Sequence, residues 1–200
     1  FPNIDIINIP DLLKFPLRSW DACIQAKEFF VHTIPHLRAI DFDLSQPFPL
    51  VEKFRENCID SVLVIAGDQP QDMSRRVFRT TSVELIRALK AQMPELKVYA
   101  GIDPYRSGLK TELDYVKRKL DAGAEGFFTQ PFFDLRLMEI YHDLLSGVET
   151  YWGISPVMSV RSKDYWGNLN NAIFPPDFEP TLQWNRTLAR QALDFCRSTD

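Results

Sequence analysis

Apolar residues along this chain fall into short, nearly continuous runs, and each run is rich in β-branched or aromatic side chains. Such runs are typical of strands, and continuous apolar character is expected where both faces of a parallel sheet are covered. We therefore predict six buried parallel strands. They occupy Ile4–Ile9, Ile34–Ile40, Ser61–Ala66, Lys97–Gly101, Glu125–Thr129 and Thr150–Ile154.

Between the runs, apolar positions recur at intervals of three and four, which is the period of an amphipathic helix. This pattern predicts helices over Ser82–Met93, Leu109–Asp121, Leu135–Leu145 and Gln183–Arg197. The strand starts lie roughly 25 to 35 residues apart, the length of a parallel strand–helix unit rather than of a hairpin. Residues 159–180 are rich in Trp, Asn and Pro, which favours a functional loop or short helices.

Residues at the helix ends support these assignments. Thr81 is placed to cap the helix that follows it, with Glu84 as the second member of a capping box. Asp134 is placed to cap the helix predicted over Leu135–Leu145. Gly123 follows the helix predicted over Leu109–Asp121, at a position that favours a left-handed conformation.

Six strands that alternate with helices allow two architectures, an open doubly wound sheet or most of a (βα)8 barrel. The length of 200 residues favours the open sheet. The chain has no Gly-x-Gly-x-x-Gly and no Walker-type motif, and polar residues follow nearly every run, which favours the barrel. The residues alone leave both architectures open, within one α/β domain over residues 1–200.

Composition excludes several classes of partner. The net charge is −4 and basic residues form no stripe, so nucleic acid is not expected. No apolar run approaches the roughly 20 residues of a membrane span, and no secretory signal is evident. Three widely separated cysteines indicate neither a disulfide framework nor a zinc site, so we expect a protein of the reducing cytoplasm. No His-x-x-x-His occurs either, so we expect no bound metal.

Polar residues lie at the ends of the predicted strands, where the loops of a parallel α/β fold bind ligands. The set is Asn8, His36, Asp68, Asp103 and Gln130, with Ser155 or the loop after it as a sixth member. Asp68 follows Gly67 and is either a turn residue or a carboxylate beside a ligand, which Gly67 would let approach the backbone. His36 on an apolar run is more often a structural residue than a base.

Three further features have both a structural and a functional interpretation. Gln130 cannot transfer a proton near neutral pH, but its amide has a donor and an acceptor for the edge of a heterocycle. A solvated helix face is the expected role of the cations Lys117, Arg118 and Lys119, and phosphate binding is the alternative. Trp166 lies in a polar segment, where it either joins the core or stacks on a flat ring.

Five motifs occur in a specific order and spacing. They are Thr33-x-Pro-His-Leu37, Gly67-Asp68-x-Pro70, Lys117-Arg118-Lys119-x-Asp121-Ala-Gly-Ala124, Thr129-Gln130-x-Phe132-Phe133-Asp134 and Gly153-Ile-x-Pro156-Val157. Together they resemble the methylenetetrahydrofolate reductase family over about residues 30 to 160. The resemblance implies a (βα)8 barrel that holds FAD. It also implies an oxidoreductase of one-carbon metabolism, which reduces 5,10-methylenetetrahydrofolate to 5-methyltetrahydrofolate with NAD(P)H.

The same resemblance implies roles for individual residues. Asp68 falls at a catalytic position near the flavin and the pterin, and Gln130 and Trp166 fall at positions that bind the folate or the nicotinamide. The positions that contact the flavin are His36, Gly67, Asp68, Arg118 and Lys119. A reduced folate is the expected partner, and a homo-oligomer stays open.

The chain also departs from the family pattern. Ala66 stands where an arginine commonly precedes the Gly-Asp pair, and Asn8-Ile-Pro-Asp11 replaces a Thr-Tyr-Gly-Ala-like turn. The first and last strands of the barrel, and a general-acid glutamate on the first, are expected outside this chain. Two alternatives therefore remain, a flavin-free folate-dependent one-carbon or methyl-transfer protein and a non-catalytic pterin-binding subunit.

Overall fold

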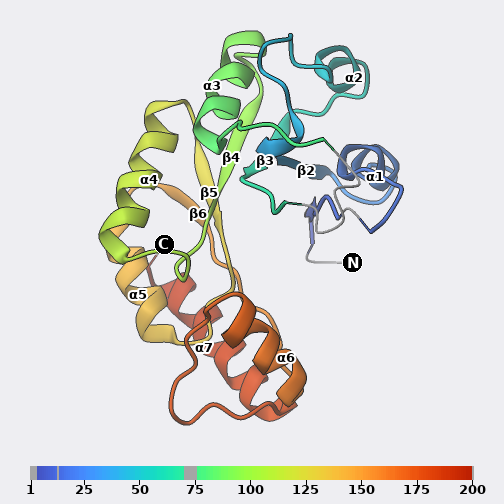
Figure 1. Ribbon diagram of the computed structural model, residues 1–200. Helices are drawn as coiled ribbons and strands as arrows, with labels where there is room; N and C mark the ends of the chain where they lie inside the picture. Colours follow the sequence, from blue (N-terminus) through green and yellow to red (C-terminus); the bar gives the residue numbers. More distant parts are fainter. Residues whose placement is uncertain (1–3, 13, 70–75, 200) are drawn as a thin grey trace. The chain divides into compact units, whose positions relative to one another are not determined.

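The computed structural model describes residues 4–12, 14–69 and 76–199 (Figure 1). Pro70 of the Gly-Asp-x-Pro motif lies outside these residues. Strands and helices alternate along most of the chain. The strands are β1 (Ile6–Ile9), β2 (His32–Arg38), β3 (Ser61–Ile65), β4 (Lys97–Ile102), β5 (Gly126–Thr129) and β6 (Glu149–Tyr151). The α-helices are α1 (Ser19–Ala26), α2 (Val51–Glu56), α3 (Ser82–Gln92), α4 (Leu109–Asp121), α5 (Leu135–Leu144), α6 (Val160–Asp164) and α7 (Leu182–Thr199).

The strand order in the sheet follows the chain order, β1-β2-β3-β4-β5-β6. The pairs from β1 to β4 are parallel, and Leu63 lies opposite both His36 of β2 and Tyr99 of β4. A doubly wound sheet reverses its strand order at a switch point, whereas a barrel does not. The sequential order therefore confirms an α/β fold with a parallel sheet of the kind found in part of a TIM barrel, and contradicts the doubly wound alternative.

The chain divides into two compact units. Unit 1 comprises Phe1–Gly101 and Tyr115–Phe127, and unit 2 comprises Ile102–Asp114 and Phe128–Asp200. Helix α4 and strand β5 each contribute residues to both units.

The core of unit 1 lies between the sheet and its helices, and α1 packs beside β2 (Figure 1). Cys23 of α1 and Leu37 of β2 are fully buried. A row of aromatic rings continues this core, with ring centroids 5.0 Å apart for Phe42 and Phe48 and 5.9 Å apart for Phe48 and Phe54. These apolar contacts fix the strands whose ends carry His36 and Gly67.

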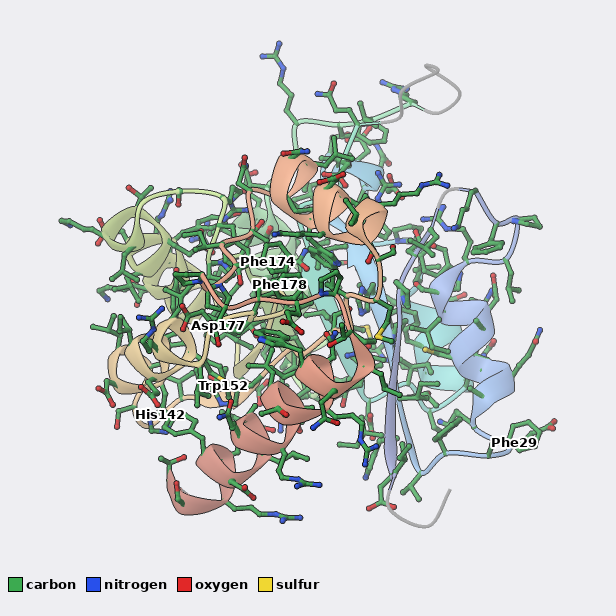
Figure 2. All side chains as sticks on the ribbon, turned by 90° about the horizontal axis from the view of Figure 1, so that it is seen from below. Phe29, His142, Trp152, Phe174, Asp177 and Phe178 are labelled. Carbon is green, nitrogen blue, oxygen red and sulfur yellow. The ribbon has the colours of Figure 1, made fainter. Side chains whose placement is uncertain are left out.

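Unit 2 has an aromatic core of its own. Phe133, which follows β5, is fully buried and stacks on Phe174 with ring centroids 4.7 Å apart. The Phe174 and Phe178 rings lie next to each other (Figure 2), with centroids 4.4 Å apart. Segment 159–180, predicted as a loop or short helices, forms α6, a π-helical turn η2 (Tyr165–Leu169) and irregular structure that supplies these rings.

The predicted helix ends are confirmed. Thr81 and Glu84 form a reciprocal capping box at the start of α3, and the Asp134 side chain accepts a hydrogen bond from the backbone N–H of Arg136 in α5. Gly123 has a φ of +108°, as the predicted left-handed position requires. The sequence patterns missed helices α1 and α2, which have only 8 and 6 residues.

Candidate functional site

The loop after β1 carries a buried carboxylate. Asp11 is 6% exposed, and its side chain accepts hydrogen bonds from Arg18 Nε at 3.0 Å and from the backbone N–H of Ser19 at 3.2 Å. Ser19 begins helix α1 and donates its hydroxyl to the His36 carbonyl at 2.6 Å. Asp11 thus fixes the start of α1 against the carboxyl half of β2.

An ion-pair network continues from Arg18 to the end of β2. Arg18 Nη2 lies 2.8 Å from Asp41 Oδ2, and Arg38 Nη1 lies 3.6 Å from Asp41 Oδ1. Arg38, the last residue of β2, is only 4% exposed. We call Asp11, Arg18, Asp41 and Arg38 the arginine–aspartate network. Two guanidinium groups face two carboxylates in it, so the charges of these four side chains balance.

The turn after β3 rests on Arg38. Gly67 has a φ of +85°, and a Cβ built on it would lie 2.9 Å from Arg38 Cβ. The Asp68 carbonyl accepts a hydrogen bond from Arg38 Nη2, whereas the Asp68 residue is exposed. The turn therefore needs glycine at position 67 and holds the backbone of Asp68 in place while its carboxylate faces solvent.

His36 lies two positions before Arg38 on β2, so both side chains point to the same face of the sheet. Its Nε2 atom is buried and has no hydrogen-bond partner among the residues that the structure describes. Burial lowers the pKa of the imidazole to about 4, although the charge of Asp11 opposes this shift. His36 is therefore neutral at pH 7, with one ring nitrogen available to a ligand.

Two of the predicted flavin contacts lie at the end of α4. Lys119 is 2% exposed, its Nζ donates to the Gly101 carbonyl at 2.5 Å, and it lies over the Tyr115 ring. Arg118 is exposed, with its guanidinium carbon 4.9 Å from the centroid of the same ring. Lys117 forms an exposed pair with Asp121. Of the three neighbouring cations, Arg118 and Lys117 face solvent and Lys119 is buried beneath β4.

In unit 2, Gln130 follows β5. The residue is exposed to solvent, and its backbone is fixed by a hydrogen bond. Its N–H donates to the Ile102 carbonyl at 2.7 Å. Gly153 packs directly on this segment, because a Cβ on Gly153 would lie 2.6 Å from the Thr129 carbonyl oxygen and 3.1 Å from the Gln130 carbonyl oxygen. The Gly153 N–H also donates to Thr129 Oγ1 at 2.9 Å. The Gln130 side chain is therefore presented from a rigid base.

A buried amide holds the loop that follows Gly153. Asn185 of α7 is 6% exposed, and its Oδ1 accepts from the Val157 N–H at 2.8 Å while its Nδ2 donates to the Val157 carbonyl at 2.9 Å. The same Nδ2 donates to the Thr181 carbonyl at 2.7 Å. One side chain thus satisfies three backbone groups and fixes the loop to α7.

Trp166 belongs to the aromatic core of unit 2. It is half-buried, and its ring centroid lies 5.3 Å from that of Phe133 and 5.6 Å from that of Tyr165. Part of the indole surface is therefore covered by the protein, and the exposed remainder is what a flat ligand would contact.

Asp103 and Glu112 form another polar cluster in unit 2. Glu112 is 1% exposed, pairs with Arg106 Nη2 at 2.7 Å and accepts from the Asp103 N–H at 3.3 Å. Burial raises the pKa of Asp103. Among the described residues the buried Tyr141 hydroxyl lacks a hydrogen-bond partner, and burial raises its pKa to about 12.

Two cavities lie within unit 2. One of about 640 Å³ lies between the start of α5 and the start of α7, where Phe133, Arg136 and Trp184 contribute to its wall. The other, of about 500 Å³, is lined by apolar side chains that include Met138 and Trp152. Gln130 lines neither cavity, so neither is assigned to its ligand.

The structure brings Gly67 and Asp68 together against Arg38, and His36 lies two positions before Arg38 on β2, whereas Arg118 and Lys119 lie on α4. Gln130 and Trp166 lie in unit 2, where Gly153 packs against the Gln130 backbone and Phe133 packs against the Trp166 ring. Asn8 is exposed on β1 and Ser155 is half-buried. Residues 4–12, 14–69 and 76–199 contain no group of three His, Cys, Asp or Glu side chains arranged to hold a metal. Nor is any helix in these ranges long and apolar enough to cross a membrane.

Sequence reasoning missed the arginine–aspartate network and Asn185. Charged residues just after an apolar strand, such as Arg38 and Asp41, were the available signal. The hydrogen bonds of the network join Arg18 to Asp11, Arg18 to Asp41 and Arg38 to Asp68, which are 7, 23 and 30 positions apart. Spacing along the chain therefore did not reveal these contacts.

Comparisons with known proteins give a consistent result. The family model described as "Methylenetetrahydrofolate reductase" matches residues 19–187. A "5,10-methylenetetrahydrofolate reductase" from Buchnera aphidicola subsp. Schizaphis graminum is 24% identical over 154 residues, which are 74% of this chain and 53% of that protein. The protein of the same name from Escherichia coli is 25% identical over 146 residues, 70% of this chain and 49% of that one. The chain thus spans about half the length of the curated relatives that it matches.

Solved structures share the fold at low identity. The oxaloacetate acetylhydrolase complex with 3,3-difluorooxalacetate has a TM-score of 0.58 and 16% identity, covering 98% of this chain and 75% of that one. A 2,3-dimethylmalate lyase of the PEP mutase/isocitrate lyase superfamily has a TM-score of 0.52 and 13% identity, covering 91% of this chain and 66% of that one. At these identities the likeness concerns the fold alone.

Proposed function

The chain belongs to the methylenetetrahydrofolate reductase family, and from this premise we propose that it reduces 5,10-methylenetetrahydrofolate to 5-methyltetrahydrofolate with FAD and NAD(P)H. The observation that carries the proposal is the family match over residues 19–187, which includes the Gly67-Asp68 and Thr129-Gln130 motifs. We further propose that the chain supplies six consecutive units of a (βα)8 barrel, in keeping with its sequential strand order.

Three features of unit 1 fit a flavin. His36 Nε2 is a buried polar atom without a hydrogen-bond partner in the described part of the chain, and a ligand would satisfy it. The left-handed Gly67 lets a flat ring approach the backbone, and the exposed Arg118 can pair with a phosphate. Lys119 already binds the Gly101 carbonyl, so we assign it to fixing the end of β4. Bound FAD supplies hydride transfer between the nicotinamide and the folate.

The residues of this chain would bind and orient the two flat rings. Asp68 presents an exposed carboxylate from a backbone that Arg38 fixes, and we propose that it accepts hydrogen bonds from N–H groups of the pterin. Gln130 offers both a donor and an acceptor from the rigid segment beneath Gly153, which suits the edge of a pterin or a nicotinamide. The exposed part of Trp166 would stack on the folate or the nicotinamide.

We place the protein in a reducing compartment, which we take to be the cytoplasm. Cys23 and Cys58 are free thiols in the structure, and such thiols persist where disulfides do not form.

The test is the colour and ligand binding of the purified full-length protein. We expect a yellow protein with flavin absorbance that NADH or NADPH bleaches and that 5,10-methylenetetrahydrofolate restores. Asp68→Asn should keep the flavin spectrum and lose most of the folate-dependent reoxidation, whereas Asp114→Asn, in an exposed pair with Lys110, should match the wild type. Colourless protein that binds a reduced folate would instead support a flavin-free one-carbon or pterin-binding role.

A further inference from the structure

The Gly67-Asp68 turn contacts one buried side chain from another strand. Arg38 is 4% exposed, its Cβ and Nε lie 2.9 and 3.0 Å from where a Gly67 Cβ would be, and its Nη2 donates to the Asp68 carbonyl. The aliphatic part of Arg38 therefore supports the turn from below, and its guanidinium fixes the carbonyl of the residue that presents the carboxylate.

Asp41 is the counterion of Arg38 and also pairs with Arg18. Asp41 Oδ1 lies 3.6 Å from Arg38 Nη1, and the Asp41 side chain is 10% exposed. The other oxygen of Asp41 accepts from Arg18, which Asp11 holds through a second pair of contacts. A buried guanidinium is stable only when it is paired, so the other three members of the network keep Arg38 charged and in place.

On these contacts we propose that Arg38 is a positioning residue for Asp68. Its guanidinium sets the orientation of the Asp68 backbone, and thereby the direction in which the Asp68 carboxylate meets its ligand. The role of Asp68 rests on the proposed function, whereas the effect of Arg38 on the turn does not. The planar fork of arginine reaches the Asp68 carbonyl and Asp41 at once, which the single ammonium of lysine cannot do.

The first experiment measures the turn itself, without any ligand. Amide hydrogen exchange of Ile40, whose N–H donates to the carbonyl of Ala66 next to Gly67, is followed in the full-length protein for wild type, Arg38→Met and Arg38→Lys. Methionine keeps the aliphatic support and removes the donors, and lysine keeps the charge. We expect exchange about tenfold faster in Arg38→Met and an intermediate rate in Arg38→Lys, because each tenfold step corresponds to about 1.4 kcal/mol of local opening.

The control is Lys27→Met, which removes another cation that binds backbone carbonyls in unit 1. Lys27 Nζ donates to Asn57 at 2.8 Å and to Cys58 at 2.7 Å, next to the amino end of β3. This variant should leave exchange at the Ile40 amide unchanged. Exchange of the Ile40 amide that is the same in Arg38→Met as in wild type, or equally fast in Lys27→Met, would overturn the proposal.

The second experiment connects the turn to the ligand through a double-mutant cycle. The dissociation constant for 5-methyltetrahydrofolate is measured for wild type, Arg38→Met, Asp68→Asn and the double variant. If Arg38 acts through Asp68, Arg38→Met should weaken binding about tenfold in the wild-type background and less than about twofold beside Asp68→Asn. Equal losses in both backgrounds would show that Arg38 acts on stability alone and contradict the proposal.

The two experiments separate the two claims. A wild-type protein that binds no reduced folate would refute the proposed function, and the exchange rates would still decide whether Arg38 positions the turn. Unchanged exchange in a protein that binds folate would refute the role of Arg38 and leave the proposed function standing.

Discussion

The strand-end loops of the two units are held by different chemistry. In unit 1, buried ions fix the loops, with Arg38 bound to the Asp68 carbonyl and balanced by Asp41, Arg18 and Asp11. In unit 2, close packing and a neutral amide do so, with Gly153 against the Gln130 backbone and Asn185 bound to Val157. Both arrangements leave the side chain of a proposed site residue, Asp68 or Gln130, exposed on a fixed backbone.

The difference shows which kind of change each region tolerates. Ion pairs are sensitive to the removal of one partner, because the remaining buried charge is then uncompensated. Close packing is sensitive to added volume, because the backbone has no room to move. We therefore expect unit 1 to respond to charge deletion and to pH, and unit 2 to respond to a single added methyl group.

The largest effect is expected for Arg18→Met in unit 1. This change leaves the side chains of Asp11 and Asp41, 2% and 10% exposed, without their shared cation. We expect a loss of about 3 kcal/mol in the free energy of unfolding, the low end for a broken buried pair because Arg18 is itself partly exposed. Chemical denaturation measures it. Lys110→Met, which breaks the exposed pair with Asp114, should cost no more than about 0.5 kcal/mol, and equal losses would refute the contrast.

The next effect in size tests the packing of unit 2. Gly153→Ala places a methyl group 2.6 Å from the Thr129 carbonyl oxygen, so β5 or the loop after β6 must shift. We expect about 2 kcal/mol of destabilisation and weaker binding of the folate proposed to contact Gln130, both measured on the same preparation. Gly108→Ala is the matched control, because its added methyl group would meet nothing within 4 Å. Equal stability of the two variants would mean that the Gly153 contact is not tight.

A third effect, of similar size, concerns the pH response of unit 1. Burial holds the pKa of His36 at about 4, against 6.5 for an ordinary histidine, so the unfolded chain binds more protons between these values. Stability contributed by neutral His36 is therefore complete above pH 6.5 and is lost as the pH falls towards 4. Between pH 7 and 4.5 the wild type should lose about 2 kcal/mol more than His36→Gln. Parallel stability curves for the two proteins would contradict this expectation.

Most of the fold follows from local patterns in the sequence. The six apolar runs predicted all six strands to within a few residues, because runs of β-branched and aromatic residues leave a strong signal. The strands β2, β3 and β4 are mostly buried, whereas the residues of β1 and β6 are exposed or half-buried, so the expectation of six buried strands was wrong for these two. The capping residues Thr81 and Asp134 and the left-handed Gly123 were predicted for the same reason, since each acts on neighbours close in the chain. The order of the strands was not predictable from the residues alone, because it depends on pairing between distant segments.

The site was less accessible to such reasoning. Gly67, Asp68 and Gln130 stand next to strand ends, where sequence position alone suggests a role. Lys119 shows the limit, because its sequence neighbours Lys117 and Arg118 are exposed while it is buried under Gly101. Nothing in the run of three cations distinguishes them. Which cation turns inward depends on the rotation of α4 against β4, a tertiary property.

The sequential strand order also bears on how the chain acquires its structure. Among the described strands, each one from β2 to β6 pairs with the strand that precedes it in the chain, so that partner is already synthesised when the strand emerges. Contacts between segments close in sequence cost less loop-closure entropy and form sooner than distant ones. During synthesis, a newly emerged strand and its helix would find their docking edge already in place. Assembly from the amino-terminal side, one strand–helix unit at a time, is thus built into this topology.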